Sequence, residues 1–77
     1  MNWYYACASE MIPYSPEMKD EVLCNSVNKS IEKLMLRNLE ELKKPVEKRH
    51  IEVTQIITTS LSHKLLVTVV SRGRIED

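Results

Sequence analysis

The sequence contains little of what several common functions require. Among its 77 residues there is one glycine and no phenylalanine, and aromatic residues make up 5% of the chain. A glycine-rich phosphate-binding loop is excluded, because its backbone needs several glycines. No apolar run approaches the ~20 residues of a membrane-spanning helix. The two cysteines, Cys7 and Cys24, are too few and too far apart for a metal site of their own.

Charge of one sign is also missing. Eleven lysines and arginines balance eleven acidic residues, and the isoelectric point is about 6.7. This balance argues against bulk attraction to nucleic acid or to an anionic membrane, so only a local patch could bind a polyanion. The opening segment has no charged start or long apolar core typical of a signal peptide. We therefore expect a cytoplasmic protein with no membrane association, and reduced cysteines that are buried as small apolar residues.

The first half of the chain predicts a strand followed by a long helix. The segment 3–9 is rich in aromatic residues and is followed by a polar stretch with proline, which favours a strand with Trp3, Tyr5 and Cys7 on one face. A helical period then extends over 16–44, with Ser15 as the expected N-cap. Met35 and Leu39 are among the apolar residues expected on its core face. A proline follows at position 45 and ends the helix. Weak helix formers around Asn25 leave a kink or a break as alternatives.

The second half predicts a β-hairpin. Residues 50–58 and 64–71 are rich in β-branched side chains and are joined by a short polar connection, and 72–77 is expected to be a tail. The chain therefore forms one small α+β domain over 1–77, in the order β-α-β-β. If all neighbours are antiparallel, the third strand lies in the middle and the spatial order is 1-3-2. Its apolar residues on both faces agree with a central position.

These elements fit a monomer poorly. A helix over 16–44 would be about 44 Å long, whereas each predicted strand is only about 25 Å long. One helix covers one face of the sheet, so apolar side chains on the other face would form an exposed patch of the kind that marks association sites. We expect a homo-oligomer, such as a dimer; the alternative is a monomer with a kinked helix. The interface candidates are Leu36, Ile56, Leu66 and Val70.

Basic side chains are concentrated on the predicted helix and at one end of the hairpin. Lys29, Lys33 and Arg37 repeat every four residues, which predicts a basic stripe on the exposed helix face. Hairpin partners whose numbers sum to about 121 would place Arg49 opposite Arg72. The functional interpretation is a docking surface for an acidic protein or a nucleic acid; the alternative is a solvated face with cations near the helix C-terminus. The candidates for binding an anion or a partner are Lys29, Lys33, Arg37, Lys44, Lys48, Arg49, Arg72 and Arg74.

Residues that perform catalysis are nearly absent. His50 and His63 fall near opposite ends of the hairpin, so the two cannot serve one site, and no spacing of histidine or cysteine suits a metal. We expect no enzymatic activity, no catalytic residue and no cofactor; the alternative is an activity formed at a subunit interface, where Cys7 or Cys24 would meet a histidine of another subunit. Asn38 lies inside the apolar stripe of the helix, where it is expected to fix the register against a partner helix.

The order of elements resembles that of the dodecins, which are small self-assembling proteins. Dodecins stack flavin on a tryptophan at the start of their second strand, whereas the corresponding place here holds Arg49 and His50. The resemblance is therefore one of element order, and it implies neither a flavin site nor membership of that family. We expect a homo-oligomeric, non-enzymatic module that binds or regulates proteins. The alternative is a nucleic-acid-binding accessory protein that uses the basic stripe and the basic sheet end.

Overall fold

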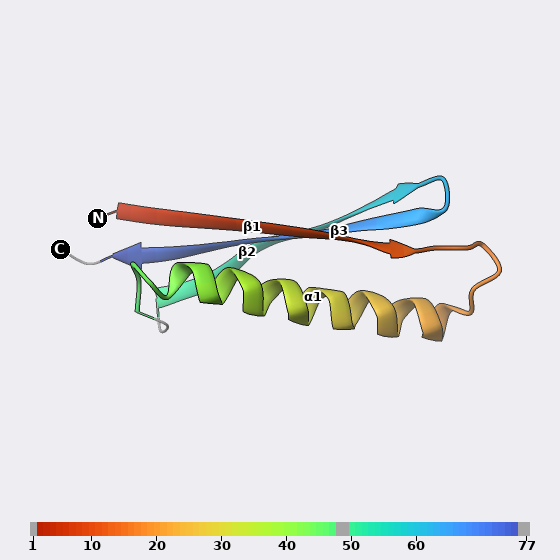
Figure 1. Ribbon diagram of the computed structural model, residues 1–77, viewed down its shortest axis with the longest axis horizontal. Coiled ribbons are helices and arrows are strands. Elements are labelled where there is room, and N and C mark those ends of the chain that lie inside the picture. The colour runs from red at the N-terminus through yellow and green to blue at the C-terminus, as the bar shows by residue number, and fades with distance from the viewer. Residues whose placement is uncertain (1, 48–49, 76–77) are drawn as a thin grey trace.

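The predicted order of elements is confirmed in the computed structural model, which describes residues 2–47 and 50–75 (Figure 1). Strand β1 spans Asn2–Pro13, helix α1 spans Asp20–Leu42, and strands β2 and β3 span Ile51–Leu61 and Lys64–Ile75. The three strands form one antiparallel sheet in the order β1-β3-β2. Helix α1 lies along one face of this sheet, and the molecule measures 51 × 18 × 15 Å.

The central position of β3 follows from its apolar residues. Val67 and Val69 are fully buried beneath α1, where they contact Leu34 of the helix and Ala8 and Ile12 of β1. Side chains alternate along a strand, so the intervening residues of β3 point to the opposite side of the sheet. We call that side, which has no helix over it, the back face.

The helix starts later than the sequence predicted. Ser15 is not its N-cap: the Ser15 carbonyl accepts a hydrogen bond from the Met18 amide at 3.0 Å, and its hydroxyl accepts one from the Glu17 amide at 3.3 Å. These bonds close a turn, and α1 begins at Asp20 after Lys19, which provides no side-chain cap. The local turn thus satisfies the polar groups that were expected to start the helix.

The expected excess of helix length over strand length is wrong. Helix α1 has 23 residues and continues without a break past Asn25, whereas β1 and β3 have 12 residues each. A helix of this size is about 35 Å long and such strands about 40 Å, so the two layers match. The expected tail contributes its first residues, up to Ile75, to β3.

The hairpin register differs from the predicted one because its turn is shorter. Only Ser62 and His63 separate the two strands, and Leu61 pairs with Lys64. Consequently Arg72 lies opposite Glu52. The register shifts by one residue between Val53 and Gln55, which makes Thr54 the extra residue of a β-bulge.

Asn38 is buried within the protomer and does not face a partner helix. Its side-chain amide nitrogen, Nδ2, donates to the Val69 carbonyl at 2.9 Å and to the Ser71 hydroxyl at 3.1 Å. The polar residue in the apolar stripe therefore joins α1 to the central strand of the same molecule. This bonding explains how an asparagine that is 2% exposed is accommodated in the core.

Candidate functional site

Strand β2 is the least covered part of the described structure. Helix α1 packs over β1 and β3 and makes few contacts with β2. Every residue of β2 except Ile51 is exposed, including the apolar side chains of Val53, Ile56, Ile57 and Leu61. One helix is too narrow to cover three strands, because neighbouring strands lie about 4.8 Å apart and a helix is about 10 Å wide.

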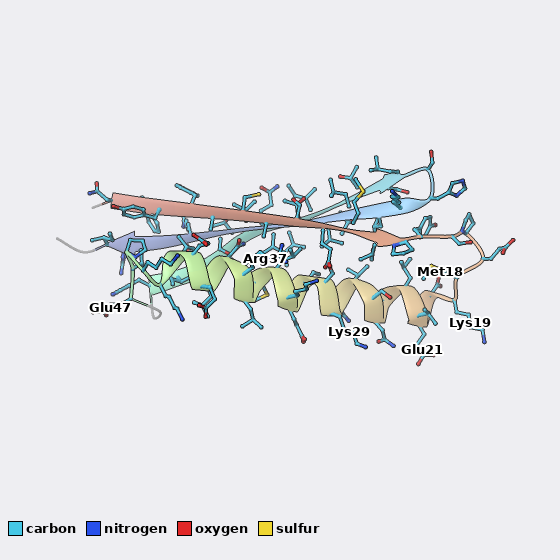
Figure 2. The ribbon with its side chains drawn as sticks, viewed as in Figure 1. Met18, Lys19, Glu21, Lys29, Arg37 and Glu47 are labelled. Atoms are coloured by element: carbon cyan, nitrogen blue, oxygen red, sulfur yellow. The ribbon has the colours of Figure 1, made fainter. Side chains whose placement is uncertain are left out.

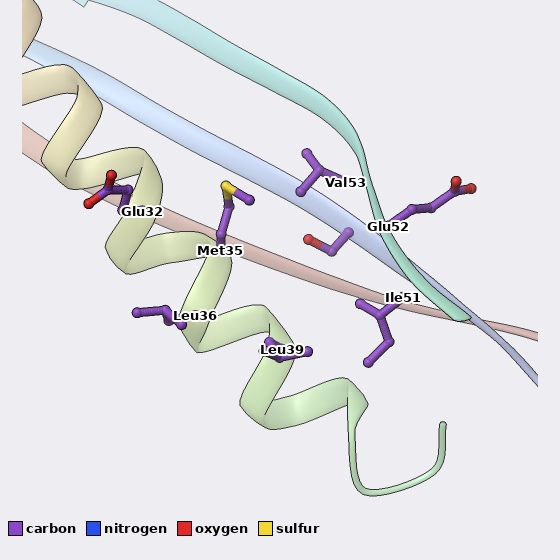
Figure 3. A pocket seen from close by; sticks show the side chains of 8 residues that line it. Glu32, Met35, Leu36, Leu39, Ile51, Glu52 and Val53 are labelled. Atoms are coloured by element: carbon purple, nitrogen blue, oxygen red, sulfur yellow. The ribbon is translucent and has the colours of Figure 1, made fainter. Parts of the chain in front are cut away.

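A groove of about 370 Å³ follows the uncovered boundary between α1 and β2, and we call it the α1–β2 groove (Figure 3). Met35 and Leu39 project from α1 towards β2, and Ile51 projects back towards α1. The lining is mostly apolar, which suits an apolar segment of a partner, and the carboxylate of Glu52 points away from α1 to Arg72. The lining residues are Glu32, Met35, Leu36, Leu39, Ile51, Glu52, Val53 and Ser71.

The sequence analysis missed this groove because it assigned Met35 and Leu39 to the core face of the helix. Both residues fall within the apolar half of the helical wheel, but at its margin. The structure leaves Met35 exposed and Leu39 half-buried, since the sheet beneath that margin is the uncovered strand. The width of the apolar stripe was the available signal, because it exceeds what two strands can bury.

The back face carries a cluster of aromatic and charged side chains at one end. Trp3 and Tyr5 follow each other on this face of β1 and are 39% and 65% exposed. The guanidinium of Arg72 lies 4.1 Å from the centre of the Trp3 ring, and its Nε donates to Glu52 at 2.6 Å. Arg74 lies opposite Trp3 in the register. We call these five residues the aromatic–arginine cluster.

Within this cluster the charge of Arg72 is paired with that of Glu52. The hydrogen bond to Glu52, together with one to Tyr5, holds the pKa of Arg72 above its ordinary value. All members of the cluster except Tyr5, together with His50 and Ile51, border a polar pocket of about 340 Å³. It is a charged site next to exposed aromatic rings, an arrangement on which planar bases or other aromatic groups can stack.

The predicted basic stripe is present on α1, but one of its three cations is tied to the sheet. Lys33 forms an ion pair of 2.7 Å with Glu10 of β1. Figure 2 shows Lys29 and Arg37 along the same helix, and both are exposed. The stripe and the aromatic–arginine cluster lie on opposite sides of the sheet, because α1 covers one face and Arg72 points to the other.

The remaining basic candidates are dispersed. Lys44 lies 4.0 Å from Glu41 one turn earlier in the chain. Arg72 and Arg74 belong to the aromatic–arginine cluster, and Lys48 and Arg49 fall outside the described residues. A single continuous basic surface does not form among the described candidates.

The four predicted interface residues occupy different surfaces. Leu36 is 62% exposed and lines the α1–β2 groove, while Leu66 and Val70 are half-buried on the back face. The bulge at Thr54 places Ile56 opposite Val69, on the helix side of the sheet. The expectation that Ile56 lies on the back face is therefore wrong, and Ile57 takes that place. Cys7 and Cys24 are exposed, contrary to their predicted burial.

The described residues contain no cluster of histidine, cysteine and carboxylate side chains that could hold a metal ion. His50 immediately precedes β2 and His63 lies in the hairpin turn, so the two lie at opposite ends of the hairpin. No helix in the described part of the chain has the length and apolar character needed to cross a membrane.

Comparisons with models of protein families, with curated proteins and with solved structures found no match to this chain.

Proposed function

We propose that the protein is a non-enzymatic, homo-oligomeric module that binds or regulates other proteins. The observation that supports self-association is the exposure of β2, which α1 leaves uncovered. This strand carries four large exposed apolar side chains, those of Val53, Ile56, Ile57 and Leu61. A small domain gains much of its stability from burying apolar area, so an uncovered strand is a strong reason to associate. The α1–β2 groove supports the binding role, because it offers an apolar surface for a partner segment.

The test of self-association is the absolute mass of the purified protein, measured by light scattering behind a sizing column. We expect a mass of at least twice the 9.0 kDa of one chain at micromolar concentration. The mass should be the same at low and high salt, because apolar contacts are not screened. A mass of 9.0 kDa under both conditions would contradict the proposal.

A second candidate function is binding of single-stranded nucleic acid, favoured by the exposure of Trp3 and Tyr5 beside Arg72. Bases stack on exposed aromatic rings of open sheet faces, and arginine contributes stacking and charge. Trp3 is the only tryptophan, so its fluorescence reports binding at this site directly. Titration with polyuridylate should quench this fluorescence with an affinity that falls as salt rises.

Two variants separate the cluster from the helix stripe as the nucleic-acid surface. Tyr5→Ala should weaken binding if bases stack on the back face, by about 1–3 kcal/mol per base. The double variant Lys29→Glu, Arg37→Glu changes only exposed cations of α1 and should leave stacking intact. If polyuridylate quenches the fluorescence of Trp3 neither in the wild-type protein nor in the variants, this second function is wrong.

A further inference from the structure

The sheet has two edges, one formed by β1 and one by β2, and they differ in how well they are protected against pairing with a further strand. Strand β2 pairs only with β3 among the described residues, so its other side presents a row of unpaired backbone groups. Such an edge is a ready template for another strand. Proteins usually protect edges with charge, proline, a bulge or a covering element.

The edge formed by β1 has several of these protections. Its exposed end carries Pro13, which has no amide hydrogen to donate. Glu10 places a charge within the strand and is held by Lys33 and by the Ser30 hydroxyl of α1. Both protections lie within 10–13, and residues 2–9 are uncharged; the larger difference between the two edges is that α1 packs along β1 and makes few contacts with β2.

The edge formed by β2 lacks them over most of its length. From Gln55 to Leu61 the residues are Gln, Ile, Ile, Thr, Thr, Ser and Leu, with no charge, proline or glycine. All are exposed, and this run keeps a regular register with β3. The bulge at Thr54 separates the run from Glu52 and does not interrupt it. Seven consecutive uncharged residues, four of them β-branched, are typical of a strand that pairs with an identical strand.

The chemistry of this run favours a second copy of the chain as the occupant. In an antiparallel pair with two-fold symmetry the residue on the axis faces its own equivalent, so a charge at the centre of the run would repel its copy. The uncharged run avoids this repulsion, and the zero net charge of the chain adds none at long range. Ile56 and Ile57 are 46% and 40% exposed on opposite faces, so pairing would give both new cross-strand neighbours.

We infer that the Gln55–Leu61 edge of β2 pairs antiparallel with the same segment of a second copy, which joins two sheets into one of six strands. This inference rests on the proposed self-association and names the surface that produces it. The two-fold axis passes through the middle of the run, near Thr58, and stands perpendicular to the sheet. Both copies of α1 then lie on the same side of the sheet, and the two α1–β2 grooves, which are lined by Ile51, Glu52 and Val53 of β2, lie towards opposite ends of the paired strands.

The experiment uses opposite charges at the centre of the run. In Thr58→Lys and Thr58→Glu, each variant alone places like charges across the axis, and we expect both to have the 9.0 kDa mass of one chain. An equimolar mixture should recover a mass of about twice 9.0 kDa, because lysine then faces glutamate. This recovery also shows that both variants fold, since an unfolded chain would not reassemble.

Matched variants test the other two exposed surfaces. Leu36→Glu introduces a charge into the α1–β2 groove, and Met11→Glu does so at an exposed position of β1 on the back face. Both should retain the wild-type mass and far-ultraviolet circular dichroism. If Leu36→Glu or Met11→Glu dissociates the oligomer and both Thr58 variants keep the wild-type mass, the edge inference is wrong. Self-association itself would then still stand.

Two other results would also overturn the edge inference. A wild-type mass of 9.0 kDa would remove the proposed function and the edge inference together. Open-ended aggregates without a defined dimer would contradict the two-fold arrangement, because an isologous interface closes on itself.

Discussion

The side chain of Asn38 links the helix to the central strand through two hydrogen bonds in a buried setting. Replacing it with alanine removes the hydrogen-bond donor that Asn38 provides to the Val69 carbonyl and to the Ser71 hydroxyl. We expect Asn38→Ala to lower the free energy of unfolding by about 1–3 kcal/mol, as found when buried polar groups lose a partner. Urea denaturation measures this change. Asn28→Ala, at an exposed position of the same helix, should alter it by less than about 0.5 kcal/mol.

Gly73 lies where the structure has no space for a Cβ atom. A Cβ at this position would lie 2.9 Å from both methyl carbons of Val46, which is itself buried. Gly73→Ala should therefore destabilise the fold by about 1–3 kcal/mol through overpacking. Val46→Ala removes the obstructing methyl groups and costs stability by itself. The double variant should lose less than the sum of the two single losses in urea denaturation; strict additivity would contradict the contact.

Single residues show where sequence reasoning reached its limit. The polarity of Asn38 was evident, but whether it faces its own sheet or a partner depends on where β3 lies. Arg72 was expected beside Arg49, and the two-residue turn instead places it opposite Glu52. A change of one or two residues in a turn alters every pairing beyond it, and no side-chain pattern in this hairpin fixed that length.

At the scale of elements, the contact between β1 and α1 depends on pH. The hydrogen bond from Lys33 and, after it, the one from Ser30 hold the pKa of Glu10 below its ordinary value of 4.5. A folded-state pKa below the unfolded one contributes stability above pH 4.5 that is lost as the pH falls through the folded-state pKa. Glu10→Gln should therefore reduce the loss of stability on acidification below pH 4.5, measured by urea denaturation at several pH values.

The control for this prediction is Glu21→Gln, which alters an exposed carboxylate near the start of the same helix. It should leave the slope of stability against pH close to that of the wild type in this range. An unchanged slope in Glu10→Gln would show that the ion pair with Lys33 does not persist in solution.

The elements themselves were well predicted in type and order. Alternation identified the strands, the helical period identified α1, and the apolar character of β3 on both faces identified the central strand. Element ends were less accurate, because the turn at Ser15 and the two-residue hairpin turn depend on backbone hydrogen bonds that residue types do not determine. The α1–β2 groove could not be located, since its existence depends on which strands one helix covers.

At the scale of the whole molecule, local and distant pairings are expected to form at different times. The hairpin of β2 and β3 closes through a two-residue turn, whereas β1 pairs residues from distant parts of the sequence, such as Asn2 with Ile75. Loop closure makes the distant pairing the slower one. Ile57→Ala, in the hairpin, should mainly slow folding, and Ile12→Ala, in β1, should mainly accelerate unfolding.

Stopped-flow kinetics in urea, at concentrations where the mass is that of one chain, measures both rates. The opposite result, with Ile12→Ala slowing folding and Ile57→Ala accelerating unfolding, would place β1 in the folding nucleus.

The central position of β3 also affects how the protein is synthesised. Ribosomes release a chain from its N-terminal side at about 5–20 residues per second, so β1, α1 and β2 all emerge before the strand to which both outer strands bond. Until β3 emerges, β1 and β2 have no partner within the sheet, and the apolar side of α1 has no buried valines to pack against. A nascent chain that stalls just before Lys64 therefore contains most of the residues of the domain and none of its sheet, and it exposes the apolar side of α1 for as long as the stall lasts.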